Sequence, residues 1–208
     1  MKRVIATVVL LVALDVVAGA AGRAAAKSGQ FYVSANYLTG TFAEYWPVGA
    51  WPTGVDVASF SDSTGVSGTQ VSFSVDFDAG YFLFDGFGVG ISTLGLFSYA
   101  NDNVGTNTVM YTVGPGIEAL YILDLGGFVS PYAKVTGNYL LLNSFSGGIW
   151  NTETSGFIVM PTVGAKLFVA PSASIDIAGF YHYTYTTQGS AWYKCSSFGL
   201  QVGISAYF

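Results

Sequence analysis

Charge, cysteine and long apolar segments are all scarce in this chain of 208 residues. Charged residues make up 9% of it, against about 25% in ordinary soluble proteins, so a water-facing surface is difficult to build. The single cysteine, Cys195, excludes an internal disulfide. One cysteine and one histidine without ligand-spaced companions also give no metal-binding pattern. We therefore expect no metal and no cofactor.

The N-terminus has the pattern of a secretory signal peptide. Two basic residues precede an apolar stretch over residues 4–14, and small residues follow it. We expect residues 1–26 to be removed by cleavage after Ala26, with Ala20 as the alternative site. A retained membrane helix is the competing interpretation, but Asp15 interrupts the roughly 18 apolar residues that a spanning helix requires.

Removal of this segment leaves four lysines and no arginine against eleven acidic residues, a formal charge of −7. No basic patch is available to neutralise phosphates, so nucleic acid is excluded as a partner. No apolar run long enough for a membrane helix follows the N-terminus, so any membrane segment must consist of strands.

Alternation of apolar with small or polar side chains supplies such strands. It is uninterrupted over residues 198–208, and it recurs over 70–82 and 108–122. Eight segments follow this pattern to differing degrees: residues 30–40, 69–83, 87–99, 108–122, 128–142, 155–169, 173–186 and 197–208. The connections between them alternate strictly. Three are short turns, and four are longer and polar, over 41–68, 100–107, 143–154 and 187–196.

This arrangement predicts an all-β fold, an eight-stranded antiparallel up-and-down transmembrane β-barrel over residues 27–208. Short turns would lie at one rim, with both termini, and long loops at the other. Closure would satisfy every backbone hydrogen bond, as lipid requires. Pro115, Pro131 and Pro161 fall within predicted strands and predict local bulges.

The composition of the polar strand face indicates that this face points inward. It carries mainly glycine, serine, threonine and asparagine rather than the charges of a soluble barrel. Lysine at mid-bilayer costs about 2–4 kcal/mol. We therefore expect a lumen network in which the lysines pair with some of the acids. Its predicted members are Asp76, Asp78, Glu118, Lys134, Lys166, Asp176 and His182.

Four segments carry a resemblance to a known family: 29–35, 129–135, 181–185 and 203–208. In this order they resemble the OmpA-like outer-membrane β-barrel domain family over essentially all of residues 28–208. The resemblance implies location in the outer membrane, with its lipid and lipopolysaccharide as surroundings. The last segment, with Gly203, Ala206 and Phe208, resembles the C-terminal signal that the barrel assembly machinery recognises.

For function, the resemblance implies structural, adhesive or small-pore (porin-like) roles. We expect a largely filled polar lumen without enzymatic activity, and an excess of acids that would make any leak favour cations. One alternative is an enzyme acting on lipid A acyl chains, because His182 and Thr184 are similar to a His-x-Ser arrangement. Another is binding or adhesion through the predicted outer loops, which hold all four tryptophans: Trp46, Trp51, Trp150 and Trp192.

Overall fold

The computed structural model describes residues 26–39, 56–61, 67–102, 107–125, 128–146, 149–188 and 191–208. The predicted signal peptide therefore lies outside the described residues, except for Ala26. Nine strands form in this part of the chain: β1 (Phe31–Thr39), β2 (Asp56–Ser61), β3 (Ser67–Phe84), β4 (Phe87–Asp102), β5 (Asn107–Ile122), β6 (Val129–Ser146), β7 (Ile149–Ala170), β8 (Ala173–Gln188) and β9 (Ala191–Tyr207).

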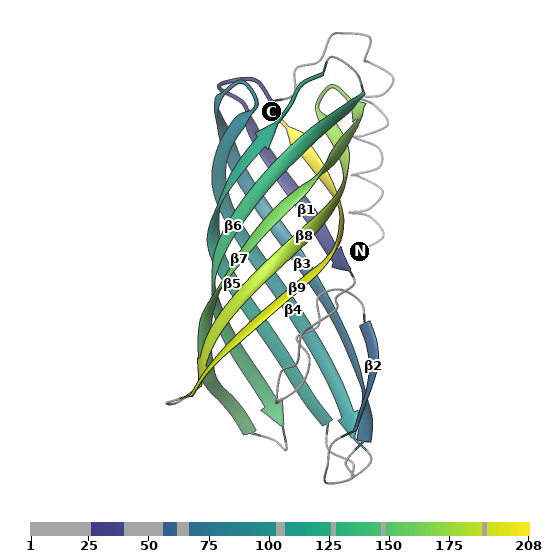
Figure 1. The fold of residues 1–208 in the computed structure, drawn as a ribbon, viewed down its shortest axis with the longest axis vertical. Coiled ribbons are helices and arrows are strands. Elements are labelled where there is room, and N and C mark those ends of the chain that lie inside the picture. Colours follow the sequence, from purple (N-terminus) through teal and green to yellow (C-terminus); the bar gives the residue numbers. More distant parts are fainter. Residues whose placement is uncertain are drawn as a thin grey trace.

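The strands close into a barrel. Neighbours along the chain pair antiparallel from β2 to β9, and β1 pairs with both β9 and β3. Strand β2 pairs with β3 over residues 67–72, while β1 pairs with β3 over residues 74–81. These two strands thus occupy successive parts of one edge of β3, so eight strand positions surround the lumen (Figure 1). The predicted fold class is confirmed.

Side-chain alternation explains why the barrel closes with its apolar face outward. Ile91, Ile117 and Val163 on neighbouring and distant strands are 65%, 72% and 68% exposed. The residues beside them in sequence point into the lumen and are mostly small or polar. Because the exposed face is apolar, it is suited to contact with lipid rather than with water.

The short turns lie where the sequence predicted them. β3 and β4 are joined by Asp85 and Gly86, and Gly86 has a φ of 82°, which glycine adopts without strain. β7 and β8 are joined by Pro171 and Ser172. The C-terminal residue Phe208 exchanges backbone hydrogen bonds of 2.9 and 3.0 Å with Phe31. Both ends of the barrel domain therefore lie at the short-turn rim (Figure 1).

The prediction of long loops at the opposite rim is wrong in three places. Residues 143–154 and 187–196 are mostly strand, because β6 to β9 continue past the predicted ends. The interval 41–68 contains β2 and the start of β3. Strands β3 to β9 have 16 to 22 residues, whereas crossing a bilayer requires about 9–11. The ends of these strands opposite the short-turn rim therefore extend beyond the membrane, and we call this part the polar extension. Neither face of a strand needs to be apolar there, so the alternation of apolar and polar residues weakens.

The prolines do not produce the predicted bulges. Pairing is interrupted at Pro115 between β5 and β6 and at Pro161 between β7 and β8, but the register is the same on both sides of each gap. Pro131 keeps its place opposite Ala165. The missing N–H removes ladder bonds locally, and the long flanking ladders hold the register. Register shifts occur elsewhere, for example between Phe82 and Phe84.

Among the described residues, no helix is long and apolar enough to cross a membrane.

Ala26, the residue after which cleavage is predicted, contacts the barrel. Its side chain is buried at the short-turn rim, and its carbonyl accepts a hydrogen bond of 2.7 Å from the Gly86 amide. Cleavage after Ala26 would remove both contacts. We expect N-terminal sequencing of the mature protein to begin at Ala21 rather than at Lys27, and a sequence starting at Lys27 would show that these contacts are dispensable.

Candidate functional site

The barrel interior is arranged in layers. On β1 and β7, the inward residues read from the short-turn rim are apolar, then polar, then apolar: Tyr32, Ser34, Asn36 and Leu38 on β1, for example. The rim layer is rich in aromatic rings and contains Ala26, Tyr32, Phe82, Leu120, Ile122, Tyr132, Ala178 and Tyr207, with Phe168 against it. The far apolar layer contains Leu38, Leu94, Leu140, Ile158, Met160 and Phe180. On β6 and β7, Lys134 and Lys166 lie between the two layers, and the acids of the lumen lie beside these lysines.

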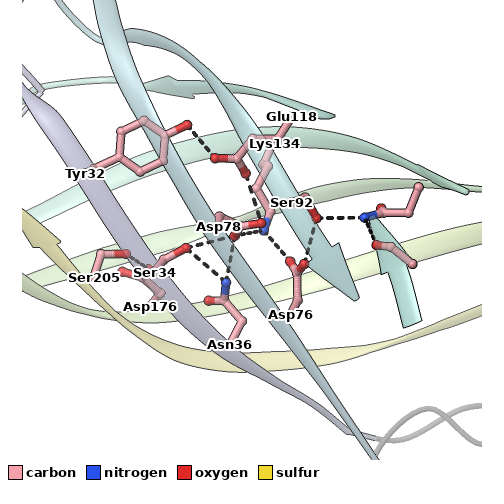
Figure 2. Close-up of polar contacts among 12 residues, drawn as sticks. Tyr32, Ser34, Asn36, Asp76, Asp78, Ser92, Glu118, Lys134, Asp176 and Ser205 are labelled. Atoms are coloured by element: carbon pink, nitrogen blue, oxygen red, sulfur yellow. Dashed lines mark hydrogen bonds and ion pairs between the residues drawn. The ribbon is translucent and has the colours of Figure 1, made fainter. Parts of the chain in front are cut away.

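Lys134 on β6 is the centre of the first charged cluster. Its ammonium nitrogen lies 2.7 Å from Asp76 Oδ2 and 2.7 Å from Asp78 Oδ2, both on β3 (Figure 2). It lies 3.9 Å from Glu118 Oε2 on β5. All four side chains are buried. Because two carboxylates share one ammonium, the cation offsets repulsion between them.

Neutral polar groups complete the shell of this cluster. Asp78 Oδ2 also accepts hydrogen bonds from Ser34 Oγ at 2.8 Å and Asn36 Nδ2 at 3.0 Å. Asp76 Oδ1 accepts one from Ser92 Oγ at 2.9 Å. Ser92 in turn accepts from Asn138 Nδ2 at 2.9 Å. We call the set Ser34, Asn36, Asp76, Asp78, Ser92, Glu118, Lys134 and Asn138, together with Tyr32, the Lys134 cluster.

Tyr32 joins the cluster by donating its hydroxyl hydrogen to Glu118 Oε1. The ring fits there because β3 and β4 carry glycine on the lumen face at Gly80 and Gly88. A Cβ at Gly88 would lie 3.0 Å from Tyr32 Cε1, and one at Gly80 would overlap the ring. Small residues on β3 and β4 thus give space to a large side chain from β1, the strand that pairs with β3 on its other edge.

A second charged cluster connects β7, β8 and β9. Lys166 Nζ lies 2.6 Å from Asp176 Oδ2 and 2.9 Å from Ser205 Oγ. Ser174 Oγ donates to Asp176 Oδ1 at 2.7 Å. The ammonium also lies 4.7 Å from the centre of the Tyr132 ring and 5.9 Å from that of Tyr207, distances at which cation–π attraction operates. We call Lys166, Ser174, Asp176, Ser205 and Tyr207 the Lys166 cluster.

The structure thus brings the six predicted charged residues together in two clusters. Four acids face two lysines, so the interior carries an excess of acidic groups. The neutral partners were not singled out from the sequence, because serine and asparagine are ordinary residues on a lumen face. Pairing register places them: Ser34 is opposite Asp78, and Asn36 is opposite Asp76.

His182 lies on β8, in the far part of the lumen, and not in either cluster. Its ring stacks on Phe180 at 6.3 Å between ring centres. His182 and Thr184 share the lumen face of β8 and are each only 2% exposed.

The predicted assembly signal forms the seam where the barrel closes. Gly203 and Ala206 on β9 pair with Asn36 and Val33 on β1. A Cβ at Gly203 would overlap the Asn36 amide, so glycine leaves the space that this side chain occupies. Phe208 is 72% exposed at the rim. The position suits an aromatic residue at the boundary between lipid and water.

The predicted loop-binding residues contribute no described side chain. Trp46 and Trp51 lie outside the described residues. Trp150 and Trp192 belong to β7 and β9 rather than to loops, opposite Phe145 and Thr187 respectively, and their side chains, like that of Cys195, lie outside what the structure describes. Across the described ranges, no group of three or more His, Cys, Asp or Glu side chains could hold a metal ion.

Two solved structures are similar to this barrel. Neisserial surface protein A has a TM-score of 0.54 at 21% sequence identity, over 87% of this chain and all of the other. AlkL, an outer membrane protein whose structure was determined by solid-state NMR in lipid bilayers, has a TM-score of 0.51 at 17% identity, over 91% of this chain and 95% of the other. No protein-family model and no curated protein sequence matches the chain.

The closed barrel, its apolar exterior and these likenesses define the class. The chain has the fold of the small eight-stranded outer-membrane β-barrels. The resemblance to OmpA-like barrels that the sequence indicated is confirmed at the level of the fold.

Proposed function

We propose that this protein is an integral outer-membrane barrel with a structural role, surrounded by lipid and lipopolysaccharide, whose lumen does not conduct. The observation that carries the proposal is the layered interior. Two apolar layers stand on either side of the charged layer, and an ion crossing the lumen would have to leave water at each of them. The cavity between the charged clusters measures only about 10 Å³.

Planar-bilayer recording tests this proposal. We expect the purified, folded protein to give no steady current steps, while a general porin in the same bilayer does. Steady steps would instead assign the small-pore role. In that case the excess of acids over lysines in the lumen predicts preference for cations, so the reversal potential in a salt gradient identifies whether the described lumen is the path.

We propose no catalytic role for His182 and Thr184. The support is their burial on the lumen face of β8, away from the lipid-facing surface. Mass spectrometry of lipid A from cells that express the protein tests this proposal. We expect unaltered acylation, and the loss of an acyl chain would contradict the proposal.

Binding at the outer end is the second candidate function. The observation that favours it is the polar extension, in which β6 and β7 pair as far as Ser146 and Ile149. A paired ladder fixes the backbone there, and a preorganised backbone favours binding. Adhesion of cells expressing the protein, compared with cells expressing Trp150→Ala and Trp192→Ala variants, measures this function.

We also propose that the C-terminal strand is read by the barrel assembly machinery. Phe208 supports the proposal because its ring is exposed while its backbone is bound to Phe31. We expect Phe208→Ser to reduce the folded protein in the outer membrane of cells, but to leave folding into pure lipid vesicles nearly unchanged. Equal losses in both systems would mean that the ring serves stability rather than recognition.

A further inference from the structure

A small cavity lies between the two charged clusters. It is lined by members of both, including Asn36, Glu118 and Lys134 from one side and Lys166 and Asp176 from the other. Gln201 on β9 and Tyr132 on β6 also line the cavity. Its volume of about 10 Å³ corresponds to the space of one water molecule, for which about 10–15 Å³ is required.

Several polar atoms of the lining residues lack a partner within the described structure. They are Asn36 Oδ1, Glu118 Oε2, Gln201 Oε1 and the Tyr132 hydroxyl. Each residue is at most 5% exposed. The Asn36 orientation is fixed, because its Nδ2 donates to Asp78, so Oδ1 is an acceptor. A buried acceptor without a donor is costly, and three of these four atoms require one.

The charges around the cavity determine what the donor is. Lys134 and Lys166 both line it, so a metal cation would face two ammonium groups. Glu118 and Asp176 line it as well, so an anion would face two carboxylates. Each lysine has three N–H donors and uses two in the contacts described above. The cavity therefore requires a neutral molecule that both accepts from ammonium and donates to oxygen.

We infer that one water molecule occupies this cavity and joins the two clusters into a single hydrogen-bonded network. The water donates to Glu118 Oε2 and to the amide oxygen of Asn36 or Gln201, and it accepts the third N–H of Lys166, so each cluster supplies a partner. Lys134 and Glu118 Oε2 are 3.9 Å apart, too far for a direct hydrogen bond, so Glu118 Oε2 is available to the water. With this molecule the network reaches all eight strand positions. Without it the network divides into β1, β3, β4, β5 and β6 on one side and β7, β8 and β9 on the other.

A high-resolution crystal structure of the unmodified protein tests the occupant. We expect one density peak within hydrogen-bonding distance of Glu118 Oε2, and no anomalous signal at that place after soaking in rubidium bromide. An empty cavity overturns the inference. An anomalous peak also overturns it, because the occupant would then be an ion.

A double-mutant cycle tests the link between the clusters in solution. Glu118→Gln and Ser205→Ala change one residue on each side, and no direct contact joins the two. Each substitution changes the unfolding equilibrium constant by some factor. We expect the factor for the double variant to differ by about twofold or more from the product of the factors for the two single variants. The control pairs Glu118→Gln with Thr187→Ala, which lies outside both clusters and should be additive. Additivity in the first cycle would show that the clusters are separate.

Discussion

Replacement of Lys134 by methionine should reduce the free energy of unfolding by about 3–5 kcal/mol, because it leaves buried carboxylates without their cation. Asp76 and Asp78 each lie 2.7 Å from the ammonium and are nearly inaccessible to water. Methionine keeps much of the side-chain volume, so the lost charge rather than a cavity causes the effect. Urea unfolding of protein folded into lipid vesicles measures it, with heat-modifiable gel migration as the check for the folded barrel.

Two further variants separate this cause from a general loss of packing. Lys27→Met removes a lysine whose 3.7 Å pair with Asp85 is exposed, and it should cost about 0–1 kcal/mol. Addition of Asp76→Asn and Asp78→Asn to Lys134→Met should recover part of the loss, because the unpaired charges disappear. If Lys134→Met were as stable as the unmodified protein, the buried ion pairs would not hold the lumen together.

Replacement of Ile117 by arginine should destabilise the folded state in lipid by about 2–4 kcal/mol. Ile117 is 72% exposed, halfway along the apolar part of β5 and between Ile91 and Gly137 on the neighbouring strands. Arginine there would lie at the centre of the bilayer. On a water-soluble barrel the same change would be nearly neutral. The measured loss of stability therefore shows whether lipid or water surrounds the exposed apolar face.

The matched control is Tyr121→Arg, on the same face of the same strand but beside the short-turn rim. Its cost should be about 0–1 kcal/mol for the charge itself, because an arginine near the interface reaches water. The measurement is again urea unfolding from lipid vesicles. Equal effects at both positions would contradict the placement of Ile117 at mid-bilayer.

The fold was predictable because the lipid-facing belt imposes one strict rule on each strand. Every second residue must be apolar wherever the strand contacts lipid, and the sequence from 198 to 208 satisfies this rule without exception. Strand β2 was missed for the opposite reason. It has only six residues, 56–61, and a segment this short shows too little periodicity to be separated from a loop.

The charged residues of the lumen were also predictable, since a charge on a transmembrane strand has only the interior available to it. Their partners were not. The link between Lys134 and Asp78 depends on tertiary register across several strands, and no local pattern encodes it. The space that glycine leaves for Tyr32 at Gly80 and Gly88 similarly depends on how β1, β3 and β4 lie side by side, which a single strand does not reveal.

The layered lumen has a consequence for the cell that carries this protein. Each inserted copy of a channel protein raises the permeability of the membrane, because it adds a route for solutes. Under the proposed role, in which the lumen does not conduct, a copy of this barrel adds no such route. The permeability of the membrane would then be independent of copy number, and a cell could carry the protein at high density without losing its barrier.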